Sequence, residues 1–290
     1  MLTETANAKI NLFLDVCSRR EDGYHELHSC MQSVGLCDTV TAELRPSSER
    51  RLRFSCTDAS LPCDERNLAY RAAVLFLEAA GVENYDLRLT VEKRIPLSAG
   101  LGGGSADAAA VLRLLNRAFE KPLDAARLGA LGARLGADVP FCIVGGTCRC
   151  LGVGEILEPV GGRPDYTVLI AKDGEGMSTP EAFSLLDARF GDFSGHASPD
   201  PEAIYQALAC GDVRRLADCA YNIFEEVVLP IRPKAKRLKE IMLRAGALCA
   251  QMSGSGPSVF GIFQSDARAE LCAARLRHEG IFAVACRTVG

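Results

Sequence analysis

The chain of 290 residues contains no tryptophan and no apolar run long enough to span a membrane. It also lacks a basic excess, because 33 lysines and arginines against 37 aspartates and glutamates give a formal net charge of −4. Proteins that bind nucleic acid in general usually carry such an excess, so this class is disfavoured. The first residues do not resemble a secretory signal peptide either. We therefore expect a cytoplasmic protein that binds neither nucleic acid nor membranes.

Cysteine is abundant, but the spacings of a zinc site or a redox pair are missing. None of the 13 cysteines forms a C-x-x-C pair, and Cys148 and Cys150 have no second pair at a zinc-finger spacing. Six others stand among apolar residues, where a thiol behaves as a small hydrophobic group: Cys142, Cys210, Cys219, Cys249, Cys272 and Cys286. We expect reduced, mostly buried cysteines and no metal site built from protein side chains.

What the chain does contain is a cluster of glycines that leads into a helix. Four glycines fall within residues 100–104, so the backbone there can adopt positive φ and approach a ligand closely. Ser105 follows where a helix N-cap is expected, and apolar residues at helical spacing then predict a helix to Phe119. A helix N-terminus offers unpaired N–H groups and the positive end of the dipole, which suits phosphate.

The glycine cluster does not match the familiar nucleotide-binding patterns. The Walker pattern fails because no lysine precedes Ser105. The dinucleotide fingerprint and the protein-kinase loop both fail because their third glycine, counted from Gly100, falls on Ser105. A tight strand-to-helix turn without a ligand is the alternative. Each glycine weakens the regular structure that contains it, so a cluster of four before a helix needs a functional reason. We therefore favour phosphate binding.

Residues 8–15 alternate with a period of two, which predicts a strand. Lys9 and Asn11 would share one face of this strand, opposite an apolar face. A strand lysine often serves only to protect a sheet edge. Because asparagine shares the face of Lys9, a cationic site is the second interpretation.

A carboxylate follows the end of a predicted helix at residues 124–135. Gly136 ends this helix, and Pro140 disfavours helical backbone at Val139, so Asp138 should lie on a sharp exit. A helix exit is the negative end of the dipole, where a carboxylate needs a cation nearby. An ordinary loop aspartate is the alternative.

An aromatic residue and an imidazole stand together behind an Asp-Gly turn. Tyr24 and His25 could stack on a planar base and hydrogen-bond to it, although such a dipeptide is usually structural. Further along the chain, a strand that includes Leu87 and Val91 should bring Lys93 and Arg94 to the mouth of the glycine loop. Two cations immediately before an anion cradle are consistent with a phosphate ligand.

The remaining apolar spacings predict an α+β protein. A glycine- and proline-rich stretch at residues 160–165 predicts a boundary between domains at 1–160 and 161–290. In the first domain we expect strands at 36–44 and 51–55, a helix at 67–80 and a hairpin at 147–158. In the second we expect a turn at 177–180, helices at 201–209, 212–228, 233–245 and 267–278, and strands at 166–171, 247–252, 258–263 and 281–288. The loop at 253–257 is either a second wall of the site or a wide hairpin.

Taken in order, these motifs resemble the small-molecule kinase superfamily of galactokinase, homoserine kinase, mevalonate kinase and phosphomevalonate kinase. The resemblance covers nearly the whole chain and rests on residues 9–12, 22–27, 96–105, 135–141 and 253–257. Within the superfamily, it is greatest to the branch that phosphorylates a cytidine diphosphate-linked methylerythritol in the non-mevalonate isoprenoid pathway. It implies a first domain like ribosomal protein S5 domain 2 and a ferredoxin-like second domain.

The resemblance also implies residue roles, with ATP and Mg²⁺ as cofactors. Asp138 would take the hydroxyl proton, or act mainly as an electrostatic partner, with Lys9 beside it. Asn67 and Lys93 would lie near the adenine. The glycine loop that binds ATP would comprise Pro96, Leu97, Ser98, Ala99, Gly100, Leu101, Gly102, Gly103, Gly104, Ser105 and Ala106. The substrate would contact Asn11, Tyr24, His25, Met31 and Phe183.

Three further expectations come with this resemblance. Met31 stands where some family members carry an aromatic residue, and its sulfur can pack on a ring. Ser105 is a candidate Mg²⁺ ligand, since Mg²⁺ usually keeps several waters and needs few protein groups.

The partner is a small molecule, and the chain would act as a monomer or weak homodimer. Another kinase of the superfamily and a non-catalytic binding protein on the same fold are the rival interpretations.

Overall fold

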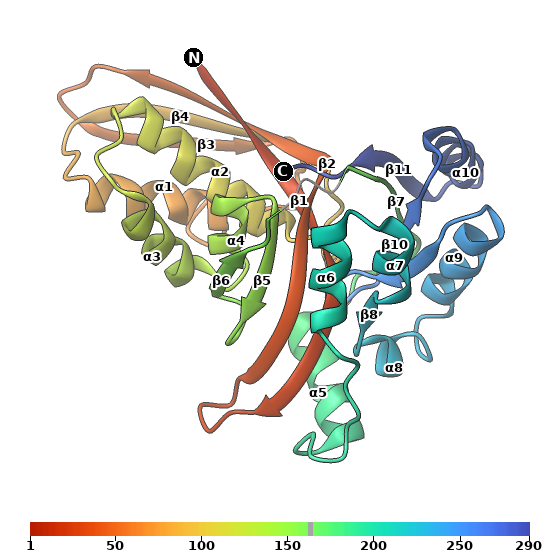
Figure 1. Ribbon diagram of the computed structural model, residues 1–290. Coiled ribbons are helices and arrows are strands. Elements are labelled where there is room, and N and C mark those ends of the chain that lie inside the picture. The colour runs from red at the N-terminus through yellow and green to blue at the C-terminus, as the bar shows by residue number, and fades with distance from the viewer. Residues whose placement is uncertain (162–164) are drawn as a thin grey trace. The chain divides into compact units, whose positions relative to one another are not determined.

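The computed structural model describes residues 1–161 and 165–290, which form two compact units (Figure 1). The first unit comprises Met1–Ala8, Leu36–Ile95 and Gly102–Val144, and the second comprises Lys9–Gly35, Pro96–Leu101 and Gly145–Gly290. Strands β1 (Leu2–Arg19) and β2 (His25–Arg45) therefore contribute residues to both units. The predicted domain boundary includes residues 162–164, which lie outside the described residues, and it stays a prediction.

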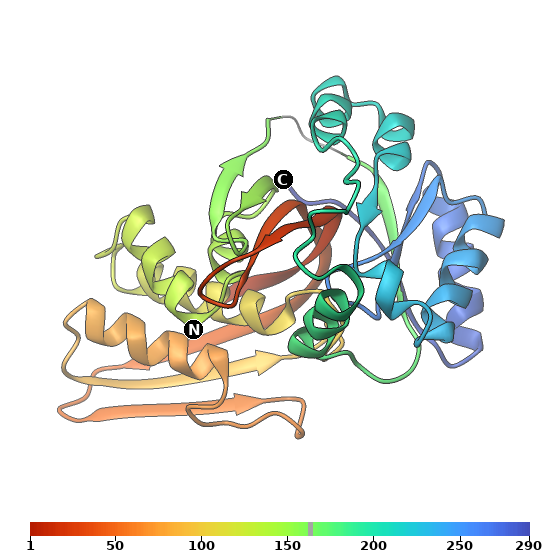
Figure 2. The same ribbon diagram turned by 90° about the horizontal axis from the view of Figure 1, so that it is seen from below.

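The first unit packs helices against one face of a sheet (Figures 1 and 2). In this sheet, β4 (Tyr85–Glu92) lies between β3 (Arg50–Cys56), which is parallel to it, and the antiparallel second half of β2. The alternating Leu87, Leu89 and Val91 are fully buried, as their spacing predicts. The helices of this unit are α1 (Leu68–Ala79), α2 (Gly103–Ala118), α3 (Ala125–Leu135) and α4 (Val139–Val144).

In the second unit, the remaining parts of β1 and β2 form a hairpin with further strands at its sides. Strand β8 (Tyr221–Asn222) pairs in parallel with β1 through Phe13 and Leu14. Strand β5 (Thr147–Leu151) pairs antiparallel with β2, and β6 (Ile156–Pro159) pairs antiparallel with β5, which confirms the predicted hairpin. Every β1 residue from Lys9 to Val16 is buried, including the polar ones.

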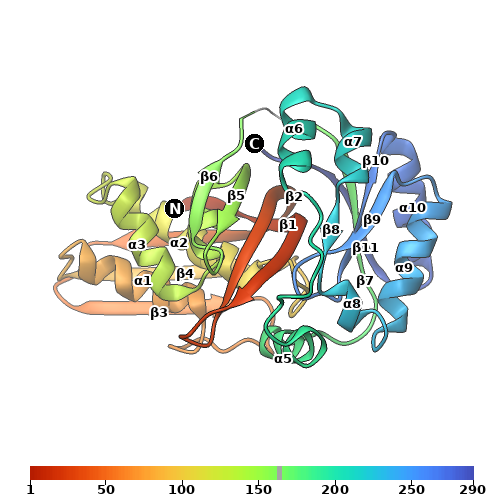
Figure 3. The same ribbon diagram turned by 60° about the horizontal axis from the view of Figure 1, so that its bottom comes forward.

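The second unit also contains a four-stranded antiparallel sheet with two helices on one face (Figure 3). Its order is β11 (Phe282–Arg287), β7 (Thr167–Lys172), β10 (Val259–Phe263) and β9 (Cys249–Met252). Helices α9 (Pro233–Arg244) and α10 (Asp266–His278) pack on this sheet. Leu238, Met242, Phe263 and Leu276 belong to the apolar core between them. Two sheets with helices confirm the α+β class.

The predicted turn at residues 177–180 is wrong, because helix α5 (Thr179–Phe190) begins there. Ser178 is its N-cap and accepts a hydrogen bond from the Glu181 N–H, while Pro180 lies in the first turn, where a helix tolerates proline. Serine before a threonine-proline pair is therefore a helix start in this chain.

The predicted helix at residues 212–228 is also wrong. The segment divides into α7 (Val213–Asp218), strand β8 and α8 (Glu225–Val228), after α6 (Glu202–Cys210). The interruption coincides with Asn222, whose side-chain amide donates to the carbonyls of Met252 (2.6 Å) and Gly254 (2.9 Å). Contacts with residues distant in sequence thus override the helical spacing.

All 13 cysteines are free, as expected for reduced thiols. Of the six cysteines expected to be buried, Cys142, Cys249 and Cys272 are buried, whereas Cys219 and Cys286 are only partly buried and Cys210 is exposed. Burial raises the pKa of the Cys249 thiol to about 12, which makes it a poor nucleophile. Among the described residues, no helix is both long and apolar enough to cross a membrane.

Candidate active site

The first half of the glycine loop packs directly on the loop at residues 253–257. The Ser253 hydroxyl donates to the Gly100 carbonyl (2.9 Å), and the Ser258 N–H donates to the Ala99 carbonyl (3.3 Å). Gly100 has φ +74°, and a Cβ atom there would lie 2.0 Å from the Ser253 carbonyl oxygen. Gly100 is therefore required by backbone packing. The loop at 253–257 forms a wall against the glycine loop.

The second half of the glycine loop begins helix α2 three residues earlier than expected. Gly102, with φ 68° and ψ 20°, is the N-cap, and no side chain caps the helix. The predicted N-cap Ser105 is thus wrong, because glycine at 102 permits the left-handed backbone from which the helix starts at Gly103. Its first N–H groups have no intrahelical acceptor. The arrangement can bind an anion.

Lys93 lies beside this helix start but shares its charge with two carboxylates. Its Nζ lies 3.5 Å from a Cβ position on Gly103, and it forms ion pairs with Asp38 and, at 2.6 Å, with Asp107. The Lys93 side chain is only 5% exposed. Burial lowers the pKa of Lys93, but Asp107 and Asp38 outweigh this effect, so its pKa is raised. Arg94 instead pairs with Glu92 at the surface.

The carboxyl group of Asp107 is under opposing influences. Burial raises its pKa to about 7, Lys93 acts to lower it, and Asp38 acts to raise it. One of its two oxygens, Oδ1, has no hydrogen-bond partner among the described residues. Sequence reasoning missed both Asp38 and Asp107. Asp107 could have been noticed, because it lies two residues after Ser105.

Asn67 has a structural role in the first unit. Its side-chain oxygen accepts from the Ala69 N–H (2.9 Å), which makes it the N-cap of α1, and its amide donates to the Pro62 carbonyl (3.0 Å). Helix α1 ends one residue before its predicted limit. These contacts fix the orientation of the Asn67 amide.

Asp138 lies between two helices of the first unit. Helix α3 ends at Gly136, as predicted, but Asp124 is its N-cap rather than its first residue, and Val139 then begins α4. The expected non-helical exit at Val139 is wrong, because Pro140 falls in a first helical turn, where its missing N–H costs nothing. The Asp138 carbonyl accepts from the Cys142 N–H (3.1 Å). The positive end of α4 favours the Asp138 carboxylate.

A buried polar chain in the second unit contains Lys9 and Asn11. Lys9 Nζ donates to Asn11 Oδ1 (2.7 Å), Asn11 Nδ2 donates to Ser29 Oγ (2.8 Å), and Ser29 Oγ donates to the Phe13 carbonyl (2.9 Å). The Lys9 N–H also donates to the Leu101 carbonyl (3.0 Å) at the glycine loop. A Cβ on Gly254 would be 3.3 Å from Lys9 Nζ. Lys9 belongs to the second unit and Asp138 to the first, so their pairing stays a prediction.

The side chains of Tyr24 and His25 lie in different environments, and their joint role in base binding stays a prediction. Tyr24 is 64% exposed, whereas His25 at the start of β2 is 7% exposed. The His25 ring stacks on Phe183 of α5, with ring centroids 4.5 Å apart and planes at 21°. Figures 1 and 3 show α5 beside the end of the β1–β2 hairpin. Met31 is buried on β2, opposite Cys148.

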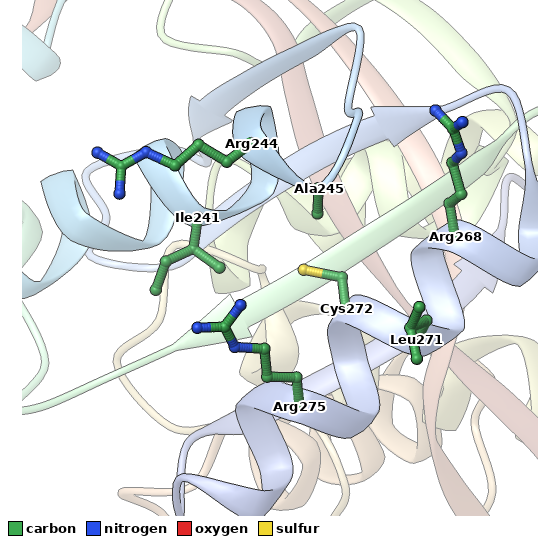
Figure 4. Close-up of a pocket in the computed structure, with 7 residues that line it drawn as sticks. All are labelled: Ile241, Arg244, Ala245, Arg268, Leu271, Cys272 and Arg275. Atoms are coloured by element: carbon green, nitrogen blue, oxygen red, sulfur yellow. The ribbon is translucent and has the colours of Figure 1, made fainter.

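A cavity of about 480 Å³ between α9 and α10 contains none of the predicted site residues (Figure 4). Arg244, Arg268 and Arg275 line it together with the exposed Leu271. Arg244 pairs with Glu240 and Arg275 with Glu279, each at 3.4 Å and one helical turn apart. These are surface ion pairs, and none of the residues that line the cavity has a buried side-chain nitrogen or oxygen without a hydrogen-bond partner.

Comparisons with known proteins agree with these features. A family model described as "GHMP kinases N terminal domain" matches residues 67–146, and one described as "GHMP kinases C terminal" matches residues 202–281. A 4-diphosphocytidyl-2-C-methyl-D-erythritol kinase of Alkaliphilus metalliredigens (strain QYMF) is 43% identical over 265 residues, which cover 91% of this chain and 89% of that protein. The enzyme of the same name from Caldicellulosiruptor bescii is 42% identical, over 94% of this chain and 93% of that protein.

Solved structures show the same relationship. A crystal structure of 4-(cytidine 5'-diphospho)-2C-methyl-D-erythritol kinase has a TM-score of 0.83 and 37% identity, and the match covers 100% of each chain. The L. major mevalonate kinase in complex with R-mevalonate has a TM-score of 0.75 at 16% identity, over 100% of this chain and 96% of that one. The second match shows that the fold is shared.

Proposed function

Because the chain belongs to the GHMP kinases, and within them to the 4-diphosphocytidyl-2-C-methyl-D-erythritol kinase family, we propose that it phosphorylates the 2-hydroxyl of that compound with ATP. This is a step of the non-mevalonate isoprenoid pathway. The observation that carries the proposal is the identity of about 40% to enzymes of that name along more than 90% of this chain. A homoserine or mevalonate kinase is disfavoured, because solved structures of those kinases are below 20% identical.

We propose that the phosphates of ATP bind at the uncapped start of α2. The glycines at 102–104 and the free N–H groups of the first turn support this placement. Asn67 and Lys93 would lie near the adenine. Because Lys93 is already held by two carboxylates, we propose that it positions the loop rather than neutralising phosphate.

For the chemical step, we propose that the substrate hydroxyl oxygen attacks the γ-phosphorus of ATP. The bond to the β-phosphate oxygen breaks, ADP leaves, and Asp138 takes the hydroxyl proton. Lys9 would stabilise the oxygen nucleophile, and Asn11 would orient the methylerythritol end. The Lys9–Asn11–Ser29 chain supports this role, since it holds the ammonium group in one position.

Mg²⁺ would neutralise charge on the phosphates when it is bound. The described residues contain no group of three or more His, Cys, Asp or Glu side chains that could hold a metal ion. This composition fits an ion held mainly by phosphate oxygens and water, as Mg²⁺ usually is at kinase sites. Ser105, in the first turn of α2, is the residue we propose as its protein ligand.

We propose that the cytidine lies at the end of the β1–β2 hairpin. Tyr24 and Phe183 would supply ring faces, His25 a hydrogen-bonding edge, and Met31 packing from the strand behind. The proximity of His25 and Phe183, which are far apart in the sequence, supports this pocket. Neither mevalonate nor homoserine has a base for such a site to recognise.

The finer architecture is also part of the proposal. The order β11-β7-β10-β9 with two helices on one face supports a ferredoxin-like second domain at residues 161–290. The first domain, at residues 1–160, would be like ribosomal protein S5 domain 2. We propose that the protein is cytoplasmic, because both of its substrates would be charged and water-soluble, and that it acts as a monomer or weak homodimer.

The test is ADP release from Mg-ATP with 4-diphosphocytidyl-2-C-methyl-D-erythritol, and with mevalonate and homoserine as alternative acceptors. Wild-type protein should turn over only the cytidyl compound, and Asp138→Ala should lose that turnover while still binding ATP. Turnover of mevalonate or homoserine alone would refute the substrate. An Asp138→Asn variant within a few-fold of wild type would refute the role of Asp138.

A further inference from the structure

Helix α5 presents two side chains to one imidazole. Phe183 and Asp187 are four residues apart, so they lie on the same face of the helix. Phe183 stacks on the His25 ring, and Asp187 Oδ1 lies 2.6 Å from His25 Nε2. Phe193 meets the same ring edge-on, with centroids 5.8 Å apart. The two phenylalanine rings thus restrict the tilt of the imidazole, and the contact with Asp187 fixes the direction in which Nε2 points.

The carboxylate determines which ring nitrogen carries the proton. A carboxylate accepts hydrogen bonds and does not donate them, so Nε2 of a neutral His25 must be the protonated nitrogen. Nδ1 then carries a lone pair and is a hydrogen-bond acceptor. Within the described part of the chain, no side chain or backbone group hydrogen-bonds to Nδ1, and this atom is not among the fully enclosed unpaired ones.

The carboxylate of Asp187 is itself held in place. Its second oxygen, Oδ2, lies 3.7 Å from the guanidinium of Arg19, which projects from the end of β1. The Asp187 side chain is about one quarter exposed, whereas the imidazole that it contacts is buried. A buried, neutral imidazole with a fixed tautomer is a directional group, because Nδ1 accepts a hydrogen bond as long as the ring stays neutral.

We propose that Asp187 is a positioning residue that makes His25 select cytosine over uracil. The two bases differ at position 4, where cytosine carries an amino group that donates and uracil carries a carbonyl oxygen that accepts. An accepting Nδ1 matches the cytosine amino group and opposes the uracil oxygen. The inference rests on the proposed cytidine substrate, and it assigns the base selectivity to a residue that does not touch the base.

The discriminating variant is Asp187→Asn, which keeps the shape of the side chain. An amide can accept from Nε2–H or donate to Nε2, so it stabilises both tautomers of His25. Titration calorimetry with CDP and UDP should show that wild-type protein prefers CDP. The ratio of the two dissociation constants should fall by about tenfold or more in Asp187→Asn, which corresponds to about 1.4 kcal/mol. Asp187→Glu, which retains an accepting carboxylate, should restore part of the preference.

A matched control exists in the same unit. Asp15 Oδ1 lies 3.0 Å from His196 Nε2 in a second buried pair, to which we assign no role in base recognition. Asp15→Asn should leave the CDP-to-UDP ratio unchanged, even if it weakens both ligands equally. An Asp187→Asn protein that weakens CDP and UDP by the same factor would reduce Asp187 to a structural role and overturn the inference.

Nitrogen-15 NMR of the imidazole gives an independent result. The His25 signals, assigned with a His25→Gln variant, should show an unprotonated Nδ1 in wild type and a mixture of tautomers in Asp187→Asn. A proton on Nδ1 of the wild type at neutral pH would overturn the inference. If the wild-type protein binds neither nucleotide, or binds both equally, the cytidine pocket and the inference about Asp187 are both refuted. If only the ratio of dissociation constants is unchanged in Asp187→Asn, the role of Asp187 alone is refuted.

Discussion

Replacing Asp107 by asparagine should stabilise the protein, and the gain should grow as the pH rises. Burial raises the pKa of this carboxyl to about 7 in the folded state, against 3.8 for an ordinary aspartate. Between these values the folded protein keeps a proton that the unfolded chain has lost. The free energy of unfolding therefore falls as the pH rises from the lower pKa to the higher one. Above the higher pKa, Asp107 causes no further loss.

The magnitude follows from the gap between the two pKa values. At about 1.4 kcal/mol per pH unit, the gap is worth about 4 kcal/mol of unfolding free energy. Asparagine cannot ionise, so it has no such pH-dependent loss of stability. Its amide can donate a hydrogen bond to Asp38, as the protonated carboxyl group would. The Lys93–Asp38 ion pair stays in place. The variant should therefore match wild type near pH 4 and exceed it by up to about 4 kcal/mol near pH 8.

The assay is urea unfolding at several pH values, followed by far-UV circular dichroism because the chain has no tryptophan. Asp124→Asn is the control, since it removes an exposed carboxylate at the N-cap of α3, where asparagine caps equally well. A stability difference between Asp107→Asn and wild type that stays constant from acid to alkaline pH would refute the reasoning. So would a variant that is less stable than wild type near pH 8.

Three further substitutions test the packing, each by the same unfolding assay. Gly100→Ala should lower the free energy of unfolding by about 3 kcal/mol or more, because φ is positive and a Cβ there would lie 2.0 Å from the Ser253 carbonyl oxygen. A decrease below about 1 kcal/mol would contradict this. Gly129→Ala, inside α3 with open space around the new methyl group, should instead stabilise by about 0.5–1 kcal/mol, and any destabilisation would be unexpected. Asn222→Ala should lower the free energy of unfolding by about 2–4 kcal/mol, since two carbonyl groups lose their shared donor. An unchanged urea midpoint would show that other groups replace this donor.

Much of the fold could be predicted because its signals are local. The alternation of Leu87, Leu89 and Val91 predicted β4, and Gly136 predicted the C-terminal end of α3. Most errors arose where local signals compete. Serine and proline at 178–180 suit either a turn or a helix start, and glycine at 102 permits a helix start that the more usual cap at Ser105 concealed.

The sequence alone also determined which chemical groups are available: a bare loop before a helix, a lysine that shares a strand face with an asparagine, and an aromatic-imidazole pair. These depend on residue type and short spacing, which are visible along the chain. Which charges and rings face one another depended on the tertiary structure. Asp38 is 55 residues from Lys93, and Asp187 is 162 residues from His25. No periodicity connects positions so far apart, because such contacts exist only after the strands have paired and the helices have packed on them.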